Sequence, residues 1–234
     1  MNNAEIITIG DEILIGQTID TNSAWMGTEL NLIGVRVNRI TSISDRREEI
    51  AGALSEALKR ADIVLITGGL GPTSDDITKD TLAEYFGAEM VMNKEVLAEV
   101  TERLRRRNLE MNGNNRRQAL VPDNCTVLMN RTGTAPGMLF VQNEKIIVSM
   151  PGVPYEMKHI MSEHVLPLLS GKVAGKVIMH KNIMTYGTFE AKLAEMLETF
   201  ERELPENIRL AYLPAQGVIK LRLTATGSSD DRVR

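Results

Sequence analysis

The alternation of short apolar runs with helix-like segments constrains the fold of this chain more than any other feature. Three strand-like runs, "AEIITIG", "VRVNRITSI" and "IVLIT", are separated by the helix-patterned segments "DTNSAWMGTELNLIG" and "SDRREEIAGALSEALKRAD". Strands that alternate with helices favour a parallel sheet with helices on both faces. The continuous apolar run of the third strand predicts a central strand covered on both sides. Such sheets bind ligands at the carboxyl ends of their strands, so functional residues are expected there.

The pattern continues to about residue 170 and then changes. Further helix and strand patterns extend the sheet as far as Leu169, whereas a strand, a helix and two paired strands follow "SGKVAGK". We therefore expect an α/β domain over residues 1–170 and a small α+β domain over residues 171–234. The chain stops soon after a strand, which is consistent with truncation of the small domain.

Composition excludes several classes of protein. Of 234 residues, 43% are hydrophobic and 25% are charged, which is unlike a disordered chain. The net charge of -4 gives no general attraction to nucleic acid, and no apolar run is long enough to span a membrane. One cysteine, Cys125, cannot form an intrachain disulfide, and the N-terminus lacks a signal-peptide pattern. A cytoplasmic protein is expected.

The turn "TGGLGPTSDDIT" follows the central strand. Gly68, Gly69 and Gly71 allow a sharp turn and close approach to a ligand, and a following helix start would offer N–H donors to a phosphate. The turn matches neither a Walker loop nor a complete dinucleotide fingerprint. Asp75 and Asp76 would repel a phosphate unless a cation lay between them, so they bind a cation, accept ligand hydroxyls, or merely cap the helix.

Three further motifs contain polar or turn-forming residues. Asp11 and Glu12 end the first strand in "GDEILIGQTIDTNS", and Asp20, Thr21 and Asn22 begin the next helix. The segment "NRTGTAPG" either contacts a polar ligand or forms a structural turn. In "MPGVPYEM", the Glu156 side chain either closes a helix cap or faces the same crevice.

These motifs, together with "NRRQALVP", resemble the N-terminal part of the CinA family of competence- and damage-inducible proteins. The glycine turn is also similar to that of the molybdopterin-binding domain of molybdenum-cofactor biosynthesis proteins. The resemblance implies a mostly parallel three-layer α/β/α domain followed by a small, incomplete KH-like α+β region. It further implies a metal-dependent hydrolase that splits the diphosphate of ADP-ribose, or of a related nucleotide sugar, into AMP and a sugar phosphate.

The resemblance assigns roles to particular residues. Asp76, with Asp75 or Asp11, would be catalytic, and Asp11 and Asp76 would hold a divalent cation (Mg, Mn, Co or Ni), with a monovalent cation as a further expected ligand. The expected ligand-binding residues are Gly10, Asp20, Thr21, Asn22, Thr67, Gly68, Gly69, Gly71, Pro72, Thr73, Thr78, Asn130, Gly133, Thr134, Ala135, Pro136, Gly137, Pro151, Gly152 and Glu156.

Other activities stay open. The same turn supports a molybdopterin-binding or adenylyl-transferring protein, and a non-catalytic nucleotide-binding module is a third alternative. Many CinA proteins continue into a domain similar to nicotinamide mononucleotide deamidases, and we expect no such activity from this chain. The family often has a Gly-x-x-Glu-Ser pattern in the small region, where this chain has Glu190 followed by Ala191. We expect a homo-oligomer with a small-molecule nucleotide ligand and no nucleic-acid or membrane partner.

Overall fold

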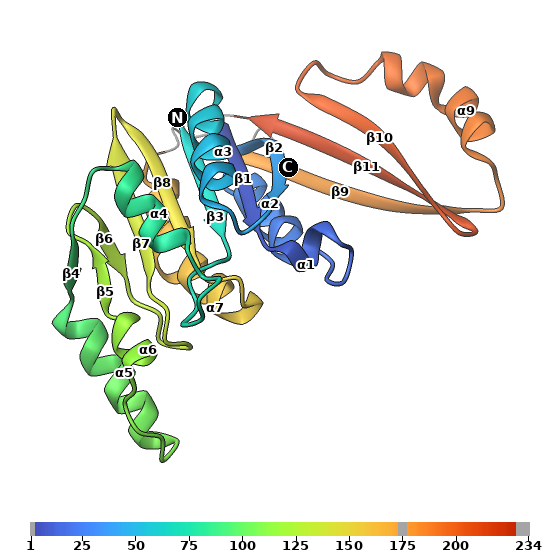
Figure 1. The fold of residues 1–234 in the computed structure, drawn as a ribbon. Helices are drawn as coiled ribbons and strands as arrows, with labels where there is room; N and C mark the ends of the chain where they lie inside the picture. The colour runs from blue at the N-terminus through green and yellow to red at the C-terminus, as the bar shows by residue number, and fades with distance from the viewer. Residues whose placement is uncertain (1–2, 173–176, 228–234) are drawn as a thin grey trace. The chain divides into compact units, whose positions relative to one another are not determined.

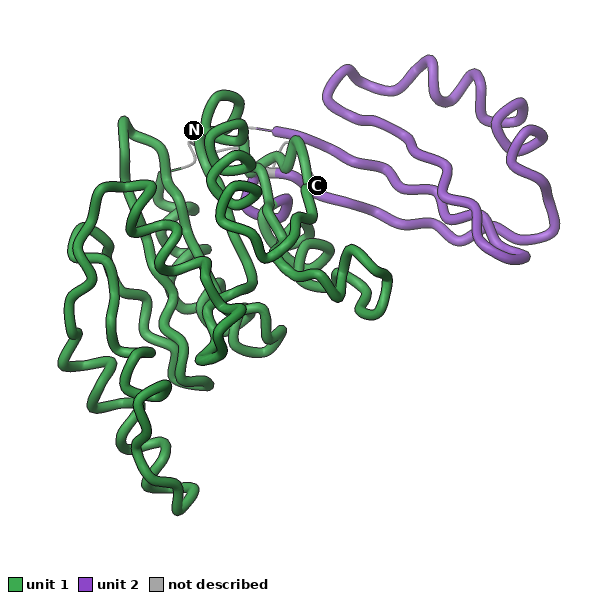
Figure 2. Tube along the Cα trace, viewed as in Figure 1, with its two compact units in different colours: residues 1–30, 35–172 green, residues 31–34, 173–234 purple. Residues whose placement is uncertain are grey.

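The computed structural model describes residues 3–172 and 177–227. The chain divides into two compact units, shown in Figure 2. The first comprises Met1–Leu30 with Val35–Lys172, and the second comprises Asn31–Gly34 with Val173–Arg234.

The first unit contains a six-stranded sheet in the order β2-β1-β3-β8-β7-β6. Its strands are β1 (Asn3–Ile9), β2 (Arg36–Ile43), β3 (Ile63–Thr67), β6 (Thr126–Leu128), β7 (Gly137–Gln142) and β8 (Lys145–Met150). Strand β7 is antiparallel to both of its neighbours, and the other strands share one direction. Every residue of β3 is buried, which confirms the prediction of a central strand.

Helices cover both faces of this sheet, as Figure 1 shows. On one face lie α3 (Arg47–Arg60) and α4 (Thr78–Tyr85), and on the other lie α2 (Thr21–Leu32) and α7 (Pro154–Ile160). Ile50 and Leu54 of α3 pack with Val64 and Ile66 in one buried cluster. Successive strand residues point to opposite faces, so Leu65 supplies the core on the other side. The predicted three-layer α/β/α class is confirmed.

Several elements differ from the sequence expectation. The predicted helix that begins at Pro154 continues as a π-helical turn, η1 (Met161–Val165), and ends as α8 (Leu166–Ser170). A short helix, α1 (Asp11–Leu14), follows β1 and had no apolar periodicity to reveal it. Between α4 and β6 lies the helix α5 (Lys94–Arg106), which the pattern of "NKEVLAEVTERLRRRN" predicts. Three short elements there were not predicted: β4 (Met90–Met92), α6 (Gly113–Arg117) and β5 (Leu120–Pro122). The strands β4 and β5 pair in a separate two-stranded sheet.

The second unit has a three-stranded antiparallel sheet in the order β10-β11-β9, with the helix α9 (Glu190–Arg202) packed against it. The strands are β9 (Val177–Tyr186), β10 (Ile208–Ala215) and β11 (Val218–Gly227). Leu193 of α9 packs with Ile219 and Leu221 of β11. The predicted small α+β region is confirmed. The prediction that it is incomplete depends on the end of the chain, and residues 228–234 lie outside the described part.

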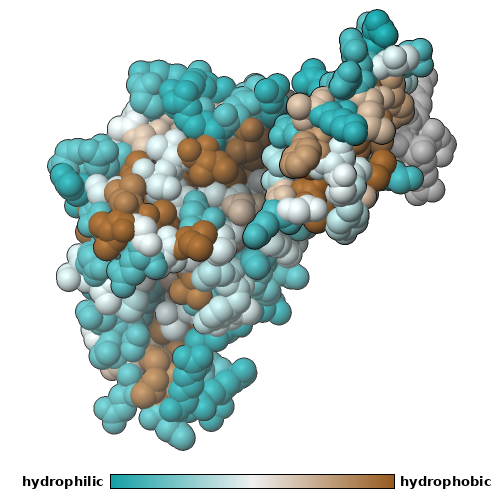
Figure 3. Space-filling view, turned by 90° about the vertical axis from the view of Figure 1, so that its right-hand side faces the viewer, coloured by the Kyte–Doolittle hydropathy of each residue, from teal (hydrophilic) through white to brown (hydrophobic). Residues whose placement is uncertain are grey.

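The surface of the described residues is mostly hydrophilic, with separate apolar groups, as Figure 3 shows for one face. The segment between α1 and α2 contributes two of the most exposed apolar residues, Ile15 at 74% and Ile19 at 83%. Among residues 3–172 and 177–227, none of the helices has the length and apolar character needed to cross a bilayer.

Candidate functional site

The carboxyl ends of four neighbouring strands form one edge of the main sheet. Thr67 at the end of β3 pairs with Thr8 of β1 on one side and with Met150 of β8 on the other. Ile9 of β1 pairs with Ile43 of β2. The loops after β1, β2, β3 and β8 therefore all leave the sheet at this edge. The sequence motifs "GDE", "TSDD" and "MPG" meet there, as predicted.

The glycine turn after β3 packs too closely for side chains at two positions. A Cβ atom at Gly68 would lie 2.1 Å from the carbonyl oxygen of Ile9. At Gly69, which has a φ of +64°, a Cβ atom would lie 2.1 Å from the hydroxyl of Thr78. Both glycines are therefore required for the turn to fold back on the sheet and on α4.

Backbone N–H groups are the main donors that this turn presents. Within the described part of the chain, the N–H groups of Gly69, Leu70 and Gly71 have no protein acceptor. The N–H of Thr78, by contrast, donates to the carbonyl of Gly69 over 3.2 Å. The first N–H of α4 is therefore already satisfied, whereas the consecutive N–H groups of the glycine turn are not. Consecutive free N–H groups in a turn form a favourable site for an anion.

Asp76 stabilises the turn instead of capping the helix. One of its carboxylate oxygens accepts hydrogen bonds from the N–H of Thr73, over 2.9 Å, and from the Thr73 hydroxyl. Helix α4 begins at Thr78, and its N-cap, Ile77, has no side-chain capping bond. Asp75 is exposed, and among the hydrogen bonds of the described residues no N–H group of α4 donates to its side chain. The capping alternative therefore fails for both aspartates.

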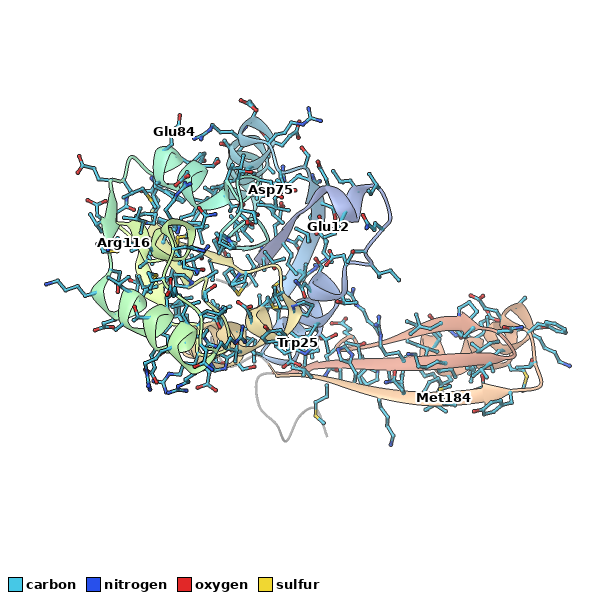
Figure 4. The ribbon with its side chains drawn as sticks, turned by 60° about the horizontal axis from the view of Figure 1, so that its bottom comes forward. Glu12, Trp25, Asp75, Glu84, Arg116 and Met184 are labelled. Atoms are coloured by element: carbon cyan, nitrogen blue, oxygen red, sulfur yellow. The ribbon has the colours of Figure 1, made fainter. Side chains whose placement is uncertain are left out.

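A carboxylate that the sequence prediction missed lies at the same edge. Asp45 follows β2, and its Oδ2 accepts a hydrogen bond from the N–H of Asp11 over 3.0 Å. Burial raises the pKa of Asp45, and the charges of Glu12, Asp11 and Asp75 raise it further, although the Asp11 hydrogen bond opposes this. Figure 4 labels Glu12, on the short helix α1 after β1, and Asp75, on the loop after β3. Four acidic side chains from three loops therefore share one region.

A cleft with about 380 Å³ of space, part of it open to solvent, adjoins this edge. Its lining includes Glu12, Asp20, Thr21, Asn22, Thr67 and Gly152. Asp20 is engaged locally, because its carboxylate accepts hydrogen bonds from the Ser23 N–H and hydroxyl. The amide nitrogen of Asn22 donates to the Gly152 carbonyl over 2.7 Å and to the Thr67 hydroxyl over 3.2 Å.

The other end of the Asn22 amide is available to a ligand. Asn22 is only 6% exposed, and among the described residues its Oδ1 has no hydrogen-bond partner. An unpaired buried oxygen costs folding free energy, which a donor on a ligand would offset. Thr67 and Pro151, two more of the predicted ligand-binding residues, contact each other. The hydroxyl of Thr67 donates to the carbonyl of Pro151 over 2.9 Å.

The loop between β6 and β7 is held by its own hydrogen bonds. Asn130 Oδ1 accepts from the N–H groups of Thr132 and Gly133, and its Nδ2 donates to Ala135 and to Glu156. A Cβ atom at Gly133 would lie 1.8 Å from Glu156 Oε2. This geometry favours the structural-turn alternative for the loop. None of its predicted residues, Asn130, Gly133, Thr134, Ala135, Pro136 and Gly137, lines the cleft described above.

The remaining predicted residues lie on the two sides of the edge. Gly10 donates its N–H to the carbonyl of Ile43 over 3.1 Å and so begins the loop that contains Asp11. Gly71, Pro72, Thr73 and Asp76 line a second cleft, on the side of the turn that faces α6. The edge therefore has a cleft on each side of the glycine turn.

A divalent cation fits this edge only with help from a ligand. No group of three or more His, Cys, Asp or Glu side chains in residues 3–172 and 177–227 converges closely enough to hold a metal by itself. Mg²⁺, however, commonly uses one or two carboxylates together with substrate phosphates and water. Asp45, Asp11 and Asp75 supply such carboxylates beside the N–H groups of the turn.

The fold and this edge define an α/β domain of the molybdopterin-binding type followed by a small KH-type region. Residues 5–171 match the family described as a probable molybdopterin binding domain, and residues 180–234 match the KH domain of the damage-inducible protein CinA. The chain belongs to the CinA family.

Individual relatives agree with this assignment. The chain is 47% identical over 232 residues to a CinA-like protein of Flavobacterium psychrophilum, covering 97% of this chain and 55% of that protein. A CinA-like protein of Cytophaga hutchinsonii is 48% identical over 231 residues, with 99% and 55% covered. The chain spans about half the length of these curated relatives. A crystal structure of CinA from Thermoplasma acidophilum, described as of unknown function, is 34% identical, with a TM-score of 0.64 over 69% of this chain and 94% of that one.

Proposed function

We propose that the sheet edge binds a molybdopterin-type ligand, a pterin that carries a phosphate. The observation that carries this proposal is the run of N–H donors at Gly69, Leu70 and Gly71, which lack acceptors among the described residues. Such a run favours a phosphate oxygen. The match of residues 5–171 to a molybdopterin-binding family supports the pterin as the attached group.

Asn22 supplies a matching acceptor for the pterin ring. Its buried Oδ1 lines the cleft beside the turn and has no donor within the described residues. A pterin presents ring N–H and amino donors, whereas a phosphate presents mainly acceptors at neutral pH. The turn and Asn22 therefore bind opposite ends of one ligand.

Binding of molybdopterin and of its dephosphorylated form tests this function. We expect the phosphorylated ligand to bind at least tenfold more tightly, and its titration to shift the backbone amide NMR signals of Leu70 and Gly71. Equal affinity for the two forms, with no shift in the turn, would exclude the phosphate role of the turn.

Metal-dependent hydrolysis of ADP-ribose is a second candidate, and the acidic cluster favours it. The charges of Glu12, Asp11 and Asp75 all raise the pKa of Asp45, so a cation beside Asp45 would relieve their mutual repulsion. A bound divalent cation would supply charge neutralisation and an activated water. The turn N–H groups would hold the diphosphate, and addition of one water across the phosphorus–oxygen–phosphorus bridge gives AMP and ribose 5-phosphate.

A screen of ADP-ribose with Mg, Mn, Co or Ni tests the second candidate. Protein-dependent release of AMP with at least one metal supports it, and loss of that release in Asp45→Asn would connect the activity to the cluster. Absence of AMP with all four metals, from protein that binds molybdopterin, removes hydrolysis and leaves binding. Addition of ATP to the molybdopterin-bound protein tests adenylyl transfer in the same series.

A further inference from the structure

The second cleft contains charged and polar groups that neither proposed function uses. It has about 420 Å³ of space, part of it open to solvent, and lies between the glycine turn, α4 and α6. Gly71, Thr73 and Asp76 line it from the turn, and Lys79, Arg117 and Gln118 line it from the other side. Because Gly71 of the turn lines this cleft, a group bound here would lie directly beside a phosphate at the turn.

Lys79 brings a half-buried ammonium group into this cleft. Its Nζ donates to the backbone carbonyls of Arg117, over 2.8 Å, and Gln118, over 3.5 Å. An ammonium has three N–H donors, and the described residues give acceptors for two of them. Burial lowers the pKa of Lys79 to about 8, so the group is still mostly charged at pH 7. One charged donor therefore remains for an anionic oxygen.

Arg117 adds a second cation at the rim. Its Nη2 is 3.3 Å from Asp80 Oδ2, and both side chains are largely exposed. Exposed ion pairs of this kind contribute little free energy. The guanidinium can therefore leave Asp80 for a ligand phosphate at small cost.

Gln118 supplies an acceptor that lacks a donor. The residue is 1% exposed, and its Oε1 has no hydrogen-bond partner among the described residues. Inorganic phosphate has mainly acceptor oxygens and too few O–H donors to satisfy this atom together with the neighbouring carboxylates. A hydroxyl group does, and the carboxylates of Asp76 and Asp80 are further acceptors for hydroxyls.

We propose that this cleft is a second binding site, which takes a sugar phosphate. Its two cations bind the phosphate, and Gln118 with the two carboxylates binds the hydroxyls. Since the two positive and two negative side chains balance, a simple anion gains little here and a ligand with both kinds of group is favoured. The site shares only Gly71 with the proposed molybdopterin site, and its two cations and Gln118 take no part in molybdopterin binding.

Ribose 5-phosphate is the probe, titrated into the full chain and followed by backbone amide NMR. We expect shifts at Thr73, Lys79 and Gln118, and an affinity at least tenfold higher than for ribose or for inorganic phosphate. Equal affinity for the three probes, no binding, or shifts confined to Asp45 and Asn22 at the sheet edge would overturn the proposal. Molybdopterin binding, measured in parallel, shows separately whether the proposed function holds.

Two substitutions sharpen this test. Lys79→Met should weaken ribose 5-phosphate binding at least tenfold, whereas Lys94→Met, on the exposed start of α5, should leave it unchanged. Gln118→Leu should also weaken binding at least tenfold, yet leave the melting temperature equal or higher, because it removes an unpaired buried oxygen. If Gln118→Leu melted normally and bound ribose 5-phosphate like wild type, the hydroxyl-binding role would be wrong.

Discussion

The carboxylate of Asp45 accepts a hydrogen bond from the backbone N–H of Asp11 over 3.0 Å. This bond joins the loops that follow β1 and β2, two neighbouring strands of the main sheet. Burial and the nearby charges of Glu12, Asp11 and Asp75 nevertheless raise the pKa of Asp45. The ionised cluster is therefore held together at a cost in folding free energy, as is common where a charged ligand binds.

Asp45→Asn should raise the melting temperature at pH 7. The folded-state pKa of Asp45 lies above the unfolded value, so the penalty for its charge is fully present above the folded pKa. It disappears as the pH falls to the ordinary value of 3.8, where the folded state binds the extra proton. Asparagine removes the charge and keeps an oxygen for the Asp11 N–H. Melting curves at pH 7 and at pH 3.5 check this.

The two pH values provide the control for this prediction. The stabilisation by Asp45→Asn should shrink or vanish at pH 3.5, where the wild-type carboxyl is protonated. A lower melting temperature for Asp45→Asn at pH 7 would mean that the charge itself stabilises the fold, and would contradict the cluster interpretation.

Substitution of the two aspartates of the glycine turn, Asp75 and Asp76, tests whether they act in catalysis or only in stability. Asp76→Asn keeps an acceptor for Thr73 but loses the charge, so melting should change little. If Asp76 anchors the catalytic cation, as the family resemblance implies, ADP-ribose turnover should fall on the order of a hundredfold or more, because that anchoring charge is lost. Asp75→Asn is the companion, measured at saturating divalent metal. Rates near wild type in both variants would remove the aspartates from the mechanism.

Gly133→Ala should destabilise the first unit by roughly 1–3 kcal/mol, the range for overpacking a filled site. The added Cβ atom would lie 1.8 Å from Glu156 Oε2, whose hydrogen bond to Asn130 holds the β6–β7 loop. Gly52→Ala is the matched control, because nothing lies within 4 Å of its Cβ position in α3. That change should be neutral or stabilising, since alanine favours helix. Equal denaturation midpoints for the two variants would contradict the packing argument.

The sequence alone was sufficient to predict the main sheet and the edge of that sheet at which the motifs meet. The alternation of strands and helices is a local signal, and the continuous run Ile63–Thr67 identified the buried central strand. Asp45 was missed because "SDRREE" reads as a helix start, and its approach to Asp11 depends on strand pairing distant in sequence. The strands β4 and β5 have three residues each, too few for periodicity to show. The binding prediction for Asn130 rested on the family resemblance and on turn-forming residues, and neither distinguishes a ligand loop from one that hydrogen-bonds to itself.

Lys79→Met should change the pH dependence of stability. The pKa of Lys79 is about 8 in the folded protein against an ordinary value of 10.5, with burial as the main cause; Arg117 also lowers it, while Asp80, Asp76 and Cys125 oppose the shift. Below pH 8 the charge is present in both states, and its burial penalty is complete. Between 8 and 10.5 the unfolded chain binds more protons, so this contribution to stability rises with pH. The melting temperature of wild type minus that of Lys79→Met should therefore increase between pH 7.5 and pH 10.

Lys94→Met, which removes an exposed lysine, is the control and should give a nearly constant difference from wild type over the same pH range. A constant difference for Lys79→Met as well would show that the ammonium group is no less solvated in the cleft than in the unfolded chain, and that it is not held there as a charged donor for a ligand.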